Sequence, residues 1–199
     1  EHVGKPKLRL KSVKVQQRTY LENVISQADY IFLKKRLKQE ENLMWYFVVR
    51  FLTATGARVS ELIQIKVEHV RIGYFDIYSK GGKVRRLFIP KLLRDEAKKW
   101  FEEIQQTTGY IFRNRFGERI TTRGIAQQLK KYAERYGLNT NVVYPHSFRH
   151  RYAKNFLERF NDIALLADLM GHESIETTRI YLRRTSSEQQ AIVDKVITW

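Results

Sequence analysis

Two pairs of residues in the sequence have the types and the spacing needed to hold a phosphate group. His146 and Arg149 lie three residues apart in His-Ser-Phe-Arg. Arg58 and Glu61 lie three apart in Arg-Val-Ser-Glu. Residues three apart share one face of a helix, and the first pair would sit near a helix N-terminus, where the dipole favours anions. In the second pair the carboxylate can hold the guanidinium in place. The two patterns together indicate a pocket for an anion.

Tyr181 is a candidate nucleophile. The chain has no cysteine, which excludes a thiol nucleophile, a thiolate zinc site and a disulfide scaffold. The sequence also has no G-x-S-x-G segment and no glycine-rich phosphate loop. The chain has 11 tyrosines, and a single tyrosine more often packs at the end of a helix than acts as a nucleophile. A catalytic role for Tyr181 is favoured by His172, which directly follows Gly171 and lies nine residues before Tyr181.

A metal site is a second interpretation of the histidines. His146 and His150 are four residues apart, a spacing that metal ligands on a helix use. Ser147 stands where zinc proteases with this spacing carry a glutamate. We therefore expect no bound metal, and a structural role for His150.

The net charge favours a polyanionic partner. The 199 residues include 37 Lys and Arg against 21 Asp and Glu, a formal charge of +16. Such a field attracts nucleic acid through counterion release. An acidic membrane surface is the competing partner, and an ordinary basic surface is the neutral interpretation. The sequence lacks an apolar run of about 18 residues and a secretory signal pattern, so we expect a soluble, intracellular protein.

Apolar periodicity and capping residues predict a mainly α fold with a small antiparallel β-sheet. Strands are expected at 74–78 and 84–89, around a Gly81-Gly82 hairpin turn, with a further short strand at 109–112. The segment 43–55 is apolar nearly all round, which is typical of a central helix. Helices are expected at about 26–39, 43–55, 57–65, 92–104, 121–136, 147–158, 162–170, 174–182 and 186–197.

Four motifs taken together resemble the tyrosine recombinase (phage integrase) family, in particular the integrases of bacterial phages and conjugative transposons. They occur in the family's order and spacing over roughly residues 20–185. Each motif is weak by itself, but the combination is highly specific. The motifs are Thr55-Gly-Ala-Arg58-Val-Ser-Glu61-Leu62, His146-Ser-Phe-Arg149-His150, Leu169-Met-Gly-His172 and Thr178-Arg-Ile-Tyr181.

The resemblance assigns the charged residues of these motifs to the phosphate. Cleavage of a phosphodiester passes through a five-coordinate phosphorus with extra negative charge on its non-bridging oxygens, and preorganised donors must meet that charge. The family gives this task to the residues that match Arg58 and Arg149, with His172 as a further donor. Glu61 is expected to orient an arginine side chain without contacting the phosphate itself.

The resemblance also implies which residues act as the general base and the general acid. In the family the tyrosine that matches Tyr181 attacks the phosphorus, and the histidine that matches His146 serves as its base. The departing 5′ oxygen takes a proton from a lysine of the hairpin turn. The segment Ser79-Lys80-Gly-Gly-Lys83 places that lysine at Lys80, with Lys83 as the alternative.

The helix that begins near residue 121 is expected to face DNA, because the family sets this N-terminus against the major groove. Arg123, next to Thr122, would then reach a base edge, where an arginine fork reads guanine. Other basic side chains would touch phosphates and position the domain without specifying sequence. A solvated basic face is the alternative for each of these: Arg85, Arg86, Arg113, Arg115, Arg119, Lys130 and Lys131.

The resemblance predicts a DNA-cutting and rejoining site-specific recombinase that needs no cofactor, metal or ATP. The expected partner is double-stranded DNA, bound as a homotetramer with possible accessory DNA-bending proteins, and the free chain is expected to be a monomer in a bacterial cytoplasm. The expected organisation is a basic arm at 1–18, left from a preceding region, then a catalytic domain at 19–185. A last helix at 186–199 would contact a neighbouring subunit.

Three other functions remain to be separated from this one. An inactive DNA-binding module would keep the basic surface without needing all six candidate catalytic residues. A type IB topoisomerase would share the covalent intermediate but relax supercoils without exchanging strands. A metal-dependent nuclease would need a carboxylate cluster, which the sequence does not offer.

Overall fold

Helices make up nearly all of the regular structure, and one two-stranded antiparallel sheet interrupts them, as the sequence predicts. The computed structural model describes residues 23–182 and 184–198; the predicted basic arm at 1–18 lies outside these ranges. In chain order the described elements are α2 (Gln27–Gln39), α3 (Leu43–Thr55), α4 (Val59–Leu62), α5 (Val67–Ile72), β1 (Tyr74–Tyr78), β2 (Val84–Phe88), α6 (Lys91–Glu103), α7 (Thr122–Arg135), α8 (Pro145–Arg159), α9 (Ile163–Met170), α10 (Ile175–Arg179), the 3₁₀ turn η1 (Ile180–Leu182) and α11 (Ser186–Val196).

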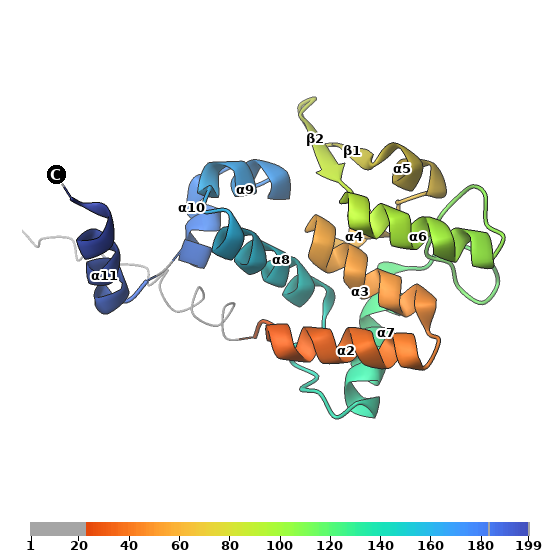
Figure 1. The fold of residues 1–199 in the computed structure, drawn as a ribbon. Coiled ribbons are helices and arrows are strands. Elements are labelled where there is room, and N and C mark those ends of the chain that lie inside the picture. Colours follow the sequence, from red (N-terminus) through yellow and green to blue (C-terminus); the bar gives the residue numbers. More distant parts are fainter. Residues whose placement is uncertain (1–22, 183, 199) are drawn as a thin grey trace, which may run out of the picture.

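The apolar helix α3 forms the centre of the larger core. Figure 1 shows it between α2, α6 and α8, and it packs against all three. Phe47, Val48, Phe51 and Leu52 are buried, which follows from a sequence that is apolar nearly all round. The helix ends at Gly56, whose φ of 68° is the left-handed conformation expected at this position. The chain turns at Gly56 and continues directly into the segment that carries Arg58.

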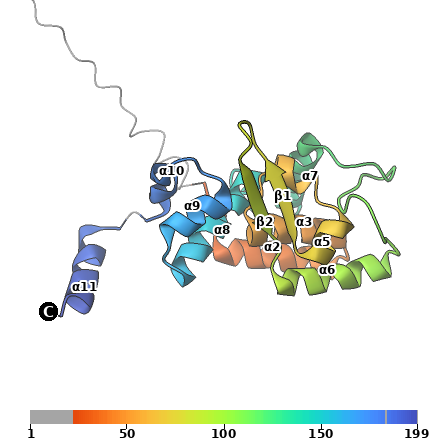
Figure 2. The same ribbon diagram turned by 90° about the horizontal axis from the view of Figure 1, so that it is seen from above.

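The hairpin of β1 and β2 extends beyond the helices at its turn (Figures 1 and 2). The strands pair from Tyr74 opposite Phe88 to Tyr78 opposite Val84. Gly81 and Gly82 both have positive φ, 86° and 77°, which glycine adopts without a steric penalty. The turn that carries the candidate lysines is therefore presented to solvent.

A smaller apolar cluster forms at the C-terminal side of the domain. Side chains from α8, α9 and η1 meet there, including Leu157, Leu166, Met170 and Tyr181. Figures 1 and 2 show α11 set apart from this cluster, and none of the side chains described for α11 is buried. No helix in residues 23–182 and 184–198 has the length and apolar character to cross a bilayer.

Three expected elements differ from the structure, and one helix was not expected. The expected helix at 57–65 is shorter and spans only Val59–Leu62, as α4. The expected strand at 109–112 is only an isolated bridge between Lys66 and Tyr110. The expected helix at 174–182 is interrupted, because α10 ends at Arg179 and continues as the tighter turn η1. The short helix α5 was not expected from the sequence, although its Val67 and Val70 are buried at a helical spacing and Gly73 ends it with a φ of 92°.

Candidate active site

Arg58 and Glu61 are held together at the start of α4. Glu61 is only 6% exposed, and its Oε1 lies 3.0 Å from Nη1 of Arg58. Its Oε2 accepts the backbone N–H of Arg58 at 2.9 Å, as in a capping box. The carboxylate therefore fixes both the backbone and the guanidinium of Arg58, whose side chain remains 40% exposed.

Arg149 reaches this region from the N-terminal half of α8. Pro145 begins the helix, and both Phe148 and Arg149 are buried in its first turns, with Arg149 3% exposed. Its guanidinium donates to the carbonyl of Gly56 at 2.5 Å, two residues before Arg58, and to the carbonyl of Met170 at 2.6 Å. Burial and the charge of Arg58 lower the pKa of Arg149 to about 10, so it stays protonated at neutral pH.

Arg85 on β2 is part of the same group of charges. Its Nη2 lies 2.5 Å from Oε2 of Glu61, and its Nη1 donates to the carbonyl of Met170 at 2.6 Å. The sequence predicts Arg85 among the phosphate contacts, but its side chain is only 12% exposed and its charge is compensated by the Glu61 carboxylate. The reason is strand alternation: Arg86 faces the other side, where it pairs with Asp76 at 2.8 Å.

His172 follows the left-handed residue Gly171 that ends α9. Its Nδ1 lies 2.8 Å from the hydroxyl of Thr178 in α10. Burial lowers the pKa of His172 to about 4, and the charges of Arg149, Arg58 and Arg85 act in the same direction. The imidazole is therefore neutral at pH 7, and when Thr178 donates to Nδ1 the ring hydrogen is on Nε2.

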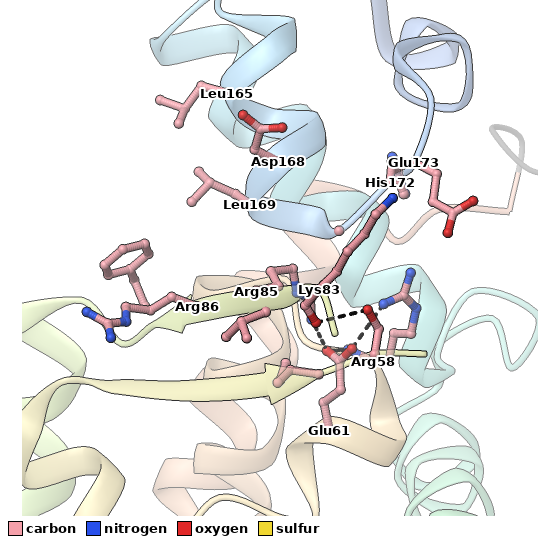
Figure 3. A pocket seen from close by; sticks show the side chains of 15 residues that line it. Arg58, Glu61, Lys83, Arg85, Arg86, Leu165, Asp168, Leu169, His172 and Glu173 are labelled. Atoms are coloured by element: carbon pink, nitrogen blue, oxygen red, sulfur yellow. Dashed lines mark hydrogen bonds and ion pairs between the residues drawn. The ribbon is translucent and has the colours of Figure 1, made fainter. Parts of the chain in front are cut away.

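A cleft of about 730 Å³ separates the hairpin from α9. Figure 3 shows Arg58, Glu61 and Arg85 gathered on one side of it, with His172 on the other. Lys83 lines the cleft, whereas Lys80 lies in the exposed turn and is not among the lining residues. Of the two lysines left open by the sequence, the structure brings Lys83 to the cleft.

Tyr181 lies half-buried in η1, and its hydroxyl is hydrogen-bonded to Nδ1 of His150. Burial raises the pKa of Tyr181 to about 12, against the opposing charge of Arg149. Burial also lowers the pKa of His150 to about 4, with smaller contributions from His146 and Arg149. The resting pair is therefore a neutral phenol and a neutral imidazole at pH 7.

His146, the base implied by the resemblance, is placed one helical turn before His150. It is exposed, and its ring centroid lies 5.7 Å from that of His150. Partial desolvation lowers the pKa of His146, as do the charges of Arg149 and Arg58. Sequence reasoning did not place His150 at the tyrosine; the available signal was the four-residue spacing, which had been weighed only as a metal pattern.

The residues proposed for DNA contact lie mostly on exposed surfaces. Arg123, Lys130 and Lys131 are exposed on α7, and Thr122 is half-exposed at its first turn. Thr121 caps this helix through its hydroxyl, as the sequence suggests. Arg123 lies in the first turn of α7, where the helix dipole also favours an anion, whereas Lys130 and Lys131 lie in its C-terminal half.

Arg86, Arg115 and Arg119 are exposed as well, and Arg113 is half-exposed. Arg86 is engaged by Asp76 and lies over the ring of Tyr74 at 3.8 Å. Its charge is therefore partly compensated within the protein.

Solved structures of recombinases and integrases share this architecture. The chain aligns with a crystal structure of XerA recombinase at a TM-score of 0.70 and 21% identity, covering 88% of this chain and 65% of that one. It aligns with the Tn1549 transposon integrase in complex with transposon right end DNA at 0.69 and 14%, covering 87% and 65%. The catalytic domain of bacteriophage HP1 integrase gives 0.60 and 21%, covering 88% and 95%. The fold is that of a tyrosine recombinase catalytic domain.

The chain belongs to the phage integrase family, whose model matches residues 32–188. It is 34% identical over 154 residues to tyrosine recombinase XerA of Pyrococcus furiosus, covering 74% of this chain and 53% of that protein. It is 33% identical over 147 residues to tyrosine recombinase XerC of Lactobacillus delbrueckii subsp. bulgaricus, covering 67% and 48%. The chain thus spans about half the length of these curated relatives.

Proposed function

We propose that this domain cuts and rejoins DNA strands in site-specific recombination, through a covalent bond between Tyr181 and a 3′ phosphate. One observation carries the proposal. Arg149 is bonded to the carbonyl of Gly56, two residues before Arg58, which lines the cleft, so guanidinium groups from distant parts of the chain come close together. Guanidinium forks match the geometry of phosphate oxygens.

The reaction is an in-line displacement at phosphorus. The oxygen of Tyr181 forms a bond to phosphorus while the bond to the 5′ oxygen breaks. Arg58, Arg149 and His172 stabilise the charge on the non-bridging oxygens. A 5′ hydroxyl from another strand then attacks the phosphotyrosine and releases Tyr181. One phosphodiester is exchanged for another, so the step needs neither ATP nor a metal ion.

The phenol must lose its proton, and we assign the proton to His146 rather than to His150. His150 is 9% exposed with a pKa of about 4, so an imidazolium there would be unsolvated and close to Arg149. His146 is exposed to water and lies one turn away on the same helix. His150 then orients the resting phenol, and Tyr181 leaves it when it moves toward the phosphate.

The 5′ oxygen leaves with a proton from a hairpin lysine. The resemblance assigns Lys80 to this task, and Lys83 is the alternative because it lines the cleft. The turn between β1 and β2 presents both ammonium groups to solvent, where bound DNA would lie against the cleft.

The expected substrate is double-stranded DNA. A formal charge of +16 favours it, and the Tn1549 integrase was solved with transposon DNA. We expect a monomer in free solution and a tetramer on DNA, in which α11 contacts a neighbouring subunit. Its exposed Ile192, Val193 and Val196 supply an apolar surface for that contact.

A nicked suicide substrate tests the proposal. The protein should form an adduct that survives a denaturing gel in the presence of EDTA. The adduct should be absent in Tyr181→Phe and reduced at least about 100-fold in Arg58→Ala and Arg149→Ala. Tyr78→Phe, which removes one exposed phenol hydroxyl of β1, is the matched control and should behave like the wild type.

Other outcomes of this assay separate the alternatives. An inactive DNA-binding module would shift DNA without forming an adduct. A metal-dependent nuclease would lose its activity in EDTA. On a supercoiled plasmid, relaxation without strand exchange would indicate a topoisomerase instead of a recombinase.

A further inference from the structure

The two neighbouring arginines of β2 face opposite sides of the hairpin. Arg86 pairs with Asp76 across the strands on the outer side. Arg85 lies opposite Ile77 in the pairing register and turns toward Glu61 (Figure 3). With 12% of its side chain exposed, Arg85 is enclosed between α4 and the end of α9.

Arg85 shares both of its acceptors with the two proposed phosphate-binding arginines. Glu61 accepts from Arg85 at 2.5 Å and from Arg58 at 3.0 Å. The carbonyl of Met170 accepts from Arg85 and from Arg149, each at 2.6 Å. The hydrogen bonds thus form one continuous chain, which runs from three cleft-lining residues to two that do not line it: Arg58, Glu61, Arg85, Met170 and Arg149.

Gly171 allows this close approach. A Cβ atom at residue 171 would lie 2.6 Å from Nη1 of Arg85 and 2.7 Å from its Cδ. Such distances would force the guanidinium out of its place. The φ of 71° at Gly171 also favours glycine. The turn before His172 and the position of the Arg85 side chain therefore depend on the same residue.

We propose that Arg85 is a positioning residue, which fixes the lysine-bearing hairpin relative to Arg58, Arg149 and His172. This inference rests on the proposed function. Nη2 of Arg85 is paired with the Glu61 carboxylate at 2.5 Å, which compensates its charge, whereas the two acceptors of Arg149 are neutral backbone carbonyls. Arg85 therefore acts on the scissile phosphate through its neighbours. Its main effect is to keep the hairpin lysine where the 5′ oxygen leaves.

The chemistry of the leaving group distinguishes this role from others. In the natural substrate the P–O5′ bond breaks and the oxygen takes a proton from the lysine ammonium. When sulfur replaces that bridging oxygen, the P–S bond breaks and the sulfur leaves as a thiolate, since thiols have a pKa of about 8.5. A misplaced lysine therefore slows cleavage of the oxygen substrate but not of the sulfur substrate.

The experiment measures the single-turnover rate of adduct formation on matched oxygen and sulfur suicide substrates. We expect Arg85→Met to be slower than wild type by roughly 10- to 100-fold on oxygen and to be within about threefold of it on sulfur, the scale of general acid catalysis. Arg58→Ala should stay slow on both substrates, because its task lies at the non-bridging oxygens.

Two further variants serve as controls for this experiment. Arg85→Lys keeps the charge but has one ammonium in place of a fork, so it should show the same selective loss on oxygen even if Arg85→Met unfolds. Arg86→Met removes the adjacent charge on the outer face, and any loss there should be equal for both substrates.

Equal losses on both substrates in Arg85→Met and Arg85→Lys, or no loss at all, would overturn the assignment of Arg85. A wild-type protein that forms no Tyr181-dependent adduct on either substrate would instead refute the proposed function, and this inference with it. Wild-type activity thus separates the two failures.

Discussion

The hydroxyl of Tyr181 and Nδ1 of His150 form a hydrogen bond, although 31 residues separate them in the chain. The bond joins η1 to α8 at the edge of the smaller apolar cluster. Burial raises the pKa of Tyr181 to about 12, so the proposed nucleophile is a neutral phenol at pH 7. The free protein therefore keeps Tyr181 in a resting position against α8, and Tyr181 is not among the residues that line the cleft.

Substitutions at His150 test whether this bond orients the phenol or takes its proton. His150→Asn offers an amide close to the position of Nδ1, whereas His150→Leu offers no acceptor. If orientation is the role, we expect His150→Asn to retain the adduct rate within about tenfold and His150→Leu to lose at least about 100-fold. His146→Asn should be as slow as His150→Leu.

The measurement is the single-turnover rate on the nicked substrate. Equal, large losses in His150→Asn and His150→Leu, with an active His146→Asn, would make His150 the base and would contradict our assignment.

The depressed pKa of His150 also predicts how stability depends on pH. The unfolded chain binds a proton near pH 6.5, but the folded state resists it until about pH 4. The unfolded state therefore binds more protons in this window, and the free energy of unfolding falls as the pH drops from 6.5 to 4. His150 alone contributes up to about 3 kcal/mol to this fall.

Urea denaturation between pH 4 and 8 checks this prediction. His150→Asn cannot titrate, so its stability should decline less than that of the wild type over the same window. His172, whose pKa is also about 4, adds a similar slope that remains in His150→Asn. An identical decline in wild type and His150→Asn would show that His150 titrates normally in the folded state.

Removing the charge of Glu61 should destabilise the fold. The carboxylate is 6% exposed and is the acidic partner of both Arg58 and Arg85. Glu61→Gln leaves two guanidinium groups close together without it, and we expect a loss of roughly 2–4 kcal/mol. The control is Glu176→Gln, which breaks an exposed pair with Arg179 and should cost less than about 1 kcal/mol.

Chemical denaturation measures both variants. A Glu61→Gln protein as stable as Glu176→Gln would mean that the buried carboxylate is not needed to hold the arginines.

The exposed cations of α7 predict two kinds of effect on DNA binding. Lys130→Ala and Lys131→Ala should weaken binding equally for all sequences, and each should reduce the slope of log K against log salt by about 1. Arg123→Ala should relax the preference for guanine at one position, because an arginine fork reads that base. Titrations of specific and scrambled DNA at several salt concentrations distinguish the two. Unchanged salt slopes would indicate that α7 faces solvent.

Sequence patterns were sufficient for most helices and for the hairpin, since caps such as Ser26 and Thr121 and the turn Gly81-Gly82 are local signals. The short helix α5 was not expected, because six residues give too little periodicity. The family pattern pointed to Arg58, Glu61 and His172, which line the cleft. Four other residues of that pattern are not among its lining residues: Lys80, His146, Arg149 and Tyr181.

Long-range side-chain contacts were harder to predict. The bond between His150 and Tyr181 depends on how η1 packs against α8, and no local pattern contains that information. The sequence predicts Arg85 and Arg86 alike as phosphate contacts, because one register step decides which of two adjacent arginines turns inward.

Identification of the residue bound to DNA is the most direct test of the account. The wild-type protein is trapped on a nicked substrate in EDTA, digested with a protease and analysed by mass spectrometry of the peptide–oligonucleotide adduct. The account predicts a phosphodiester link on Tyr181 to the 3′ end of the cleaved strand. A link on any other residue, or on the 5′ end, would contradict it.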